Sequence, residues 1–167
     1  MPIILITGGV RSGKSVRAEA RALGFAGRPI YLATAEALDA EMSERIARHR
    51  ERRGPGWIAR DVPLDVAQTL IETDGGGARL VDCLTLWLSN LMHAERDVAR
   101  ETSRLAETLA GQKSPVVLVT NEVGLGIVPD NALARRFRDA AGVMNQVIAG
   151  VADEVEFVVA GLPMRVK

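Results

Sequence analysis

The chain has 167 residues, of which 47% are hydrophobic, 25% are charged and 4% are aromatic, and its 21 basic and 21 acidic side chains leave a formal net charge of zero. This length suits one domain, 1–167, and the balanced charge argues against a broad nucleic-acid surface. A single cysteine, Cys83, excludes an intrachain disulfide and a cysteine-rich zinc site, and favours a reducing, cytoplasmic setting. The apolar runs are too short to span a bilayer.

Short apolar runs alternate with segments of helical character along the chain. The expected strands are 3–7, 29–33, 78–82, 116–120 and 155–159, with 164–167 returning as a hairpin arm. The expected helices are 16–25, 39–53, 64–73, 84–94, 98–109 and 131–150, and 52–56 is expected to be a mobile loop. Continuous apolar strands suit a sheet buried on both faces. Their alternation with helices therefore predicts an α/β fold with a mainly parallel sheet flanked by helices.

A glycine-rich segment stands between the first expected strand and the first expected helix, which makes that strand part of the core rather than a signal peptide. Its sequence, Gly8-Gly9-Val10-Arg11-Ser12-Gly13-Lys14-Ser15, matches the P-loop pattern G-x-x-x-x-G-K-S. Glycines let successive N–H groups point at a phosphate chain, and the following helix adds its positive N-terminal end. Lys14 is expected to reach the β/γ-phosphates, and Ser15 to ligate a Mg²⁺ bound to them. The segment predicts a nucleoside triphosphate site.

Polar side chains follow two of the expected strands. Asp82 ends the third strand, where it could hold Mg²⁺ or a nucleotide hydroxyl, or could instead cap the helix after it. Asn121 and Glu122 follow the fourth strand and either face the site or organise the glycine-bearing loop 123–129. The sequence does not decide between the two roles of Asp82, or between the two roles of Asn121 and Glu122.

A second cluster lies on the expected helix 39–53, where His49 stands among the arginines at 45, 48, 50, 52 and 53. Like-charge repulsion favours the neutral imidazole, which is a nucleophile, and the guanidinium groups could bind the phosphates that it attacks. The alternative is a solvated basic face with a structural His49. His93 suits an ordinary helix surface, and Cys83 suits a packed core thiol.

The chain resembles the bifunctional adenosylcobinamide kinase / adenosylcobinamide-phosphate guanylyltransferase family of cobalamin synthesis. The resemblance covers essentially the whole chain in order, at 6–15, 31–35, 39–42, 45–50, Trp57, 80–85, 90–91, 119–129, 138–142 and 145–146. The P-loop alone would not single out this family. The Thr-Asn-Glu-Val-Gly segment that begins at Thr120, together with the Arg-His cluster, does.

The resemblance implies a RecA-like P-loop fold, a homotrimer and two reactions. ATP or GTP first phosphorylates the aminopropanol hydroxyl of adenosylcobinamide. GTP then guanylylates a histidine, which is His49 by its place in the motif, and the GMP passes to adenosylcobinamide phosphate. The resemblance makes Lys14 and His49 catalytic, and it implies nucleotide contacts at Gly8, Gly9, Val10, Arg11, Ser12, Gly13, Lys14, Ser15, Ala33, Thr34, Ala35, Arg50, Glu51, Arg52, Arg53, Asp61 and Asp82.

Two other functions compete with this one. The first is an ordinary P-loop small-molecule kinase in which His49 is structural. The second is a nucleotide-gated binding module without chemistry. The neutral net charge and the lack of an aromatic-basic stripe argue against a nucleic-acid-dependent ATPase.

Overall fold

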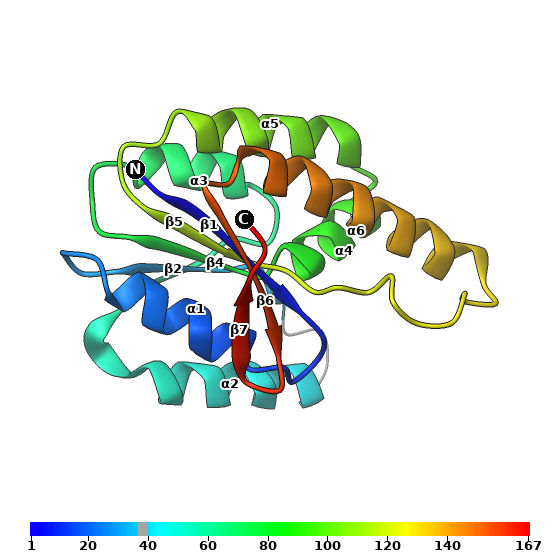
Figure 1. Cartoon of the computed structure of the whole chain (residues 1–167), viewed down its shortest axis with the longest axis horizontal. Coiled ribbons are helices and arrows are strands. Elements are labelled where there is room, and N and C mark those ends of the chain that lie inside the picture. The colour runs from blue at the N-terminus through cyan, green and yellow to red at the C-terminus, as the bar shows by residue number, and fades with distance from the viewer. Residues whose placement is uncertain (37–39) are drawn as a thin grey trace.

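One twisted sheet runs through the molecule, in the strand order β3-β2-β4-β5-β1-β6-β7 (Figure 1). A computed structural model describes residues 1–36 and 40–167, although within helix α2 it does not describe the side chains of Glu41, Met42, Arg45, His49, Arg50, Arg52 and Arg53. The first six strands are parallel, and β7 is antiparallel to β6. Their bounds are β1 Ile3–Gly8, β2 Ile30–Ala33, β3 Ile58–Asp61, β4 Arg79–Asp82, β5 Val116–Val119, β6 Glu154–Val159 and β7 Leu162–Arg165.

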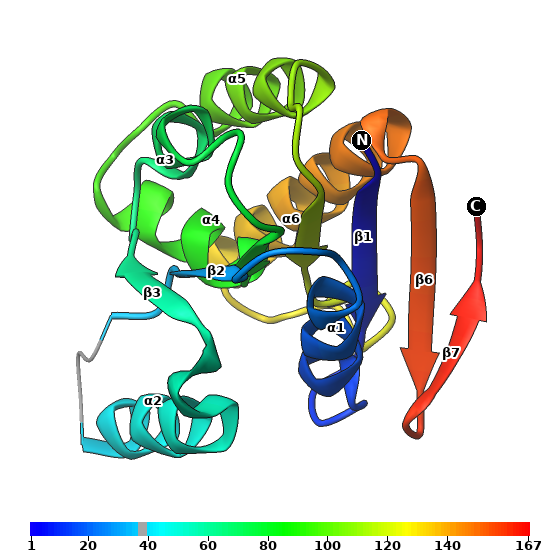
Figure 2. The same cartoon turned by 90° about the vertical axis from the view of Figure 1, so that its left-hand side faces the viewer.

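Helices cover both faces of the sheet. Figures 1 and 2 show α1 and α2 on one side of it and α3 to α6 on the other. The bounds are α1 Lys14–Leu23, α2 Ala40–Arg53, α3 Val66–Glu72, α4 Leu84–His93, α5 Val98–Ala110 and α6 Ala132–Val151, with a 3₁₀ turn η1 at Gly54–Gly56. None of the helices in the described part of the chain has the length and hydropathy of a membrane span.

Successive side chains of a strand point to opposite faces of the sheet, so they pack into two separate apolar cores. Leu5, Val81 and Leu118 pack with the α3–α6 layer. Their neighbours Ile4 and Leu80 pack on the other face, which α1 covers. Because both faces are buried, the central strands are apolar throughout, and the predicted mainly parallel α/β fold is confirmed.

Two local predictions were wrong. Strand β3 was not expected, because all four of its residues, Ile58–Asp61, are exposed and carry no apolar run. The segment 52–56, expected as a loop, completes α2 at Arg53 and continues as the 3₁₀ turn η1. The hairpin arm is present as β7, but it begins at Leu162 rather than at Met164.

An ion pair ties together the loops at the amino ends of the strands. Arg79, the fully buried first residue of β4, donates to Asp74 at 3.2 Å. The Asp74 carboxylate also accepts from the backbone amides of Lys113 and Ser114, each at 3.0 Å. Burial alone would raise the pKa of Asp74, but these amides and the Arg79 charge outweigh it and lower that pKa. The folded state therefore favours the ionised carboxylate.

We predict that Asp74→Asn lowers the free energy of unfolding by about 3 kcal/mol at pH 7, because Arg79 is left buried without its counter-charge. A folded-state pKa below the unfolded value gives stability that is present above the unfolded pKa and is lost as the pH falls through the folded pKa. The difference between the two proteins in urea unfolding is therefore expected to shrink below about pH 4. A difference that does not change with pH would contradict this account.

Candidate active site

The phosphate loop, residues 8–15, joins β1 to α1 at the edge where the parallel strands end (Figure 2). Two of its glycines are required by close packing. A Cβ on Gly8 would lie 2.6 Å from the carbonyl oxygen of Val158, and one on Gly13 would lie 3.1 Å from the Cα of Gly161. Gly13 also has a φ of 96°, which L side chains rarely adopt. The loop therefore lies directly against the tip of the β6–β7 hairpin.

Two hydrogen bonds fix this loop to its neighbours. The amide of Gly161, in the hairpin tip, donates to the carbonyl of Ser12 at 2.8 Å. The amide of Glu122, after β5, donates to the carbonyl of Gly8 at 3.2 Å. Strand β1 lies between β5 and β6, so the loop is held from both sides.

The arrangement suits an anion. The first turn of α1 carries no acidic side chain, so its unpaired amides and the positive end of the helix dipole are not neutralised there. Lys14 is buried, and its Nζ donates to the carbonyl of Gly9 at 2.8 Å, which keeps the ammonium against the loop. Ser12 Oγ is buried and has no hydrogen-bond partner among the described residues. A buried hydroxyl of this kind normally has a partner, so it fits a loop that receives phosphate oxygens.

Three of the predicted residues lie in a row at the carboxyl ends of neighbouring strands. Ala33 of β2 pairs with Asp61 of β3 on one side and with Asp82 of β4 on the other. The hydroxyl of Tyr31 donates to Asp82 Oδ2 at 2.7 Å, and the Tyr31 ring packs edge-on against Trp57. This bond, which no pattern in the sequence indicates, orients the carboxylate.

The charges of both Lys14 and Asp82 act on the buried thiol of Cys83. Burial, together with the Asp82 charge, raises the pKa of this thiol to about 11, although the Lys14 charge acts in the opposite direction. Both charges therefore act on the same buried point. The thiol stays protonated at neutral pH, so the prediction of a packed core thiol is confirmed.

The side chain of Thr34, which was predicted to contact the nucleotide, makes structural hydrogen bonds. It is fully buried, and its hydroxyl donates to the carbonyl of Cys83 and accepts from the Cys83 amide, both at 2.8 Å. Asn90 Nδ2 donates to the carbonyl of Thr34 at 2.7 Å. The Thr34 side chain therefore ties the ends of β2 and β4 together, which leaves the half-buried Ala33 and Ala35 as the surface of this segment.

The alternatives for the other strand-end residues can now be decided. The N-cap position of α4 is occupied by Cys83, so Asp82, one residue earlier, is not the helix cap. Glu122 Oε1 accepts from the amide of Gly124 at 3.0 Å, which makes Glu122 an organiser of its loop. Asn121 Nδ2 lies 3.7 Å from Cys83 Sγ, and its amide donates to Thr85 Oγ1 at 2.8 Å. Glu122 therefore organises the loop after β5, whereas Asn121 connects that loop to Cys83 and to the start of α4.

A buried polar chain beneath that loop was missed. Thr85 Oγ1 and Thr120 Oγ1 lie 3.3 Å apart, and Thr120 donates to Asn145 Oδ1 at 2.8 Å. Asn145 Nδ2 in turn donates to the carbonyl of Asn121 at 3.3 Å. The sequence does show a threonine, Thr120, directly after an apolar strand. Its partner Asn145 lies on α6, 25 residues later, so the pairing is visible only in the fold.

Helix α2 carries His49, with Glu51 exposed on the same helix. The side chains of His49, Arg50, Arg52 and Arg53 lie outside the described residues. The helix leads through η1 into β3, at the opposite margin of the sheet from β6 and β7 (Figure 2). Strand β3 is four strand spacings from β1, or about 19 Å along the sheet. The row formed by Asp61, Ala33 and Asp82 begins at β3 itself and extends across β2 to β4, toward β1.

Comparison with known proteins decides the family. The family model described as cobinamide kinase / cobinamide phosphate guanyltransferase matches residues 4–166. The chain belongs to this family. Its curated relatives include the bifunctional adenosylcobalamin biosynthesis protein CobP of Pseudomonas aeruginosa, 46% identical over 166 residues, which are 98% of this chain and 96% of that protein. The protein CobU of Salmonella typhimurium is 41% identical over 99% of both chains.

A solved structure supports the fold alone. An ATPase from the type III secretion system of pathogenic bacteria superposes with a TM-score of 0.55 at 12% identity. The match covers 98% of this chain and 56% of that chain. The predicted P-loop class of fold is confirmed by this likeness and by the phosphate loop geometry.

We predict that Lys14→Ala lowers kcat/KM for the nucleotide in phosphate transfer about 100- to 1000-fold, because one charge aimed at the transferred phosphate is removed. Lys113→Ala is the matched control, because this exposed lysine precedes β5 at the amino ends of the strands, and the change should leave kcat/KM unchanged. Steady-state assays of γ-phosphate transfer measure both. Unchanged turnover in Lys14→Ala would place the nucleotide elsewhere.

Proposed function

We propose that the phosphate loop binds the triphosphate in both reactions of this family and that His49 carries GMP between them. As a family member, the chain is a bifunctional kinase and guanylyltransferase of cobalamin biosynthesis. The observation that carries the assignment of the site is the glycine-bounded loop at the start of α1, with Lys14 folded against it. ATP or GTP and adenosylcobinamide are the substrates of the first step.

In the kinase step, the aminopropanol hydroxyl attacks the γ-phosphorus, and the bond to the β-phosphate oxygen breaks. Phosphoryl transfer of this kind is accelerated mainly by positioning and by charge neutralisation. The loop amides and Lys14 supply both on the protein side. We assign the accompanying Mg²⁺ to the hydroxyl of Ser15, with Asp82 assisting through water; a metal ion held there would neutralise negative charge on the triphosphate.

In the guanylyl step, a ring nitrogen of His49 attacks the α-phosphorus of GTP, and pyrophosphate leaves. A phosphate oxygen of adenosylcobinamide phosphate then attacks the same phosphorus, the P–N bond breaks, and the imidazole is regenerated. This division replaces one difficult transfer with two easier ones. The row of Asp61, Ala33 and Asp82 supports the proposal, because it joins the strand that follows α2 to the centre of the sheet. We assign the guanosine to this row and to Arg50, Glu51, Arg52 and Arg53.

We also propose that the protein acts in the cytoplasm as a homotrimer. The single buried cysteine suits a reducing compartment. The edge strand β7 and the residue after it expose Leu162, Met164 and Val166. Exposed apolar side chains on an edge strand favour association with another chain.

We predict that the protein retains label from GTP labelled at the α-phosphate, in a linkage that is labile in acid. His49→Ala is expected to lose this label while keeping part of the γ-phosphate transfer to adenosylcobinamide, because the first step does not use the imidazole. The measurement is radiolabel in precipitated protein, followed by mass spectrometry of the labelled peptide.

The chain offers a matched control in its second histidine. His93 is on α4, where its Nδ1 lies 2.8 Å from the carbonyl of Ser89, and it is exposed. His93→Ala should retain the label in full. Label in neither the natural protein nor the variants would favour the plain kinase, and label that survives His49→Ala would assign the GMP to another residue.

A further inference from the structure

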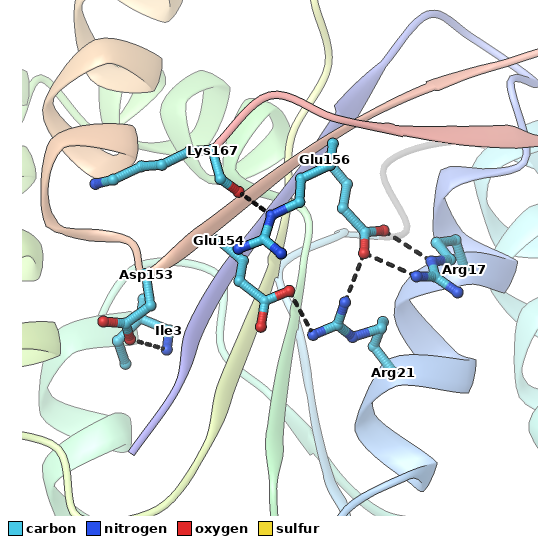
Figure 3. Close-up of polar contacts among 8 residues, drawn as sticks. Ile3, Arg17, Arg21, Asp153, Glu154, Glu156 and Lys167 are labelled. Carbon is cyan, nitrogen blue, oxygen red and sulfur yellow. Dashed lines mark hydrogen bonds and ion pairs between the residues drawn. The ribbon is translucent and has the colours of Figure 1, made fainter.

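Four charged side chains form a cluster between α1 and β6, drawn in Figure 3. Arg17 binds Glu156 in a bidentate pair, with Nε and Nη2 at 2.7 and 2.8 Å from the two carboxylate oxygens. Arg21 bridges two acids, at 2.6 Å from Glu156 and 2.9 Å from Glu154. Glu156 is 5% exposed, so its charge is almost fully removed from water. We call these four residues the arginine–glutamate cluster.

The spacing of the cluster locks a helix onto a strand. Arg17 and Arg21 are about one turn apart on α1, so they share a face of the helix. Glu154 and Glu156 are two residues apart on β6, so they share a face of the sheet. Arg17 is therefore held at Glu156, and Arg21 is held between Glu156 and Glu154. A bidentate Arg–carboxylate pair constrains angle as well as distance.

The apolar contact between α1 and the sheet is made by small side chains. The apolar residues of α1 that are buried are two alanines, Ala18 and Ala22, whereas Val16 and Leu23 are more than half exposed. Alanines allow close approach but provide no long side chain that interlocks with the sheet. The arginine–glutamate cluster therefore supplies the long side-chain contacts that the apolar face of α1 lacks.

Strand β6 also fixes the backbone of the phosphate loop. Glu156 pairs with Ile6 of β1, two residues before Gly8. Further along β6, the carbonyl of Val158 lies so close to Gly8 that a Cβ there would collide with it. In the hairpin tip, the amide of Gly161 donates to the carbonyl of Ser12. The same strand thus holds the loop through its backbone and the helix after the loop through Glu156.

A direct chemical role does not fit Glu156. Both of its oxygens are occupied by guanidinium groups, and the Arg17 hydrogen bonds lower the pKa of its carboxyl, although burial opposes them. A carboxylate held in this way is a poor proton acceptor. Maximal stability does not require the pair either, because apolar residues often replace a buried ion pair without loss.

We propose that Glu156 is a positioning residue for phosphate binding and transfer. Through Arg17 and Arg21 it sets the register of α1 against β6, and so fixes where the first amides of α1 and Lys14 meet the phosphates. This inference rests on the proposed assignment of the phosphate loop as the nucleotide site.

The test is Glu156→Gln, which keeps the size of the side chain and removes its charge. We expect the dissociation constant for a non-hydrolysable GTP analogue with Mg²⁺ to rise about tenfold or more, since misplacing binding groups by about 1 Å can cost about a hundredfold. KM for the nucleotide should rise with it, and KM for adenosylcobinamide should stay the same. Calorimetry at a temperature where every variant is folded measures the binding.

Asp74→Asn is the control for stability, because it breaks a buried pair at the opposite ends of the strands. If Glu156 acts through position, Asp74→Asn loses stability but keeps its affinity for the analogue. Glu154→Gln, which breaks one ion pair, should weaken binding less than Glu156→Gln does. Should Glu156→Gln not fold, Arg17→Lys replaces it, because lysine cannot form the bidentate pair.

The outcomes separate this inference from the assignment of the site. If Lys14→Ala loses affinity for the analogue but Glu156→Gln or Arg17→Lys only loses stability, the positioning role is wrong and the nucleotide site stands. If Lys14→Ala keeps its full affinity, the assignment of the phosphate loop fails first. A rise in the dissociation constant for Glu156→Gln, with none for Asp74→Asn, supports the proposal.

Discussion

The close passage of the phosphate loop over the tip of the β6–β7 hairpin is the constraint on which the rest of the site depends. Gly8 and Gly13 allow that passage, and a side chain at either position would meet backbone atoms of the hairpin. The hairpin amide of Gly161 then holds the loop by the carbonyl of Ser12. In consequence, the first amides of α1 are already in place before a phosphate binds.

The carboxyl edge of the sheet runs from this loop to β3, the strand that follows the helix carrying His49. Between β1 and β3, the strand ends are tied together by buried polar groups, with Thr34 joining β2 to β4 and Thr120 connecting β5 to α6. Such groups are costly to bury unless they are paired, and here their pairing makes the edge rigid. We infer that both reactions take place at this edge, with the triphosphate held by the loop after β1.

Much of this arrangement could be predicted from the sequence because its signals are local. The phosphate loop is contiguous, and the central strands are apolar because both faces are buried. Strand β3 could not be predicted, because at the exposed edge it pairs through backbone bonds that its side chains do not indicate. Glu156 was overlooked for a related reason: its arginine partners lie about 135 residues earlier in the chain, so only the fold shows that the acid is paired. The side chain of His49 lies outside the described residues, and its role stays a proposal.

Amide hydrogen exchange, with and without a non-hydrolysable GTP analogue and Mg²⁺, tests the central claim most directly. If the loop binds the triphosphate, the peptides that cover residues 8–16 should gain protection, and so should the hairpin tip at Gly161, whose amide is bonded to the loop. Protection in the region of α2 and β3 that leaves 8–16 unchanged would contradict the account, because the phosphates would then bind away from the phosphate loop.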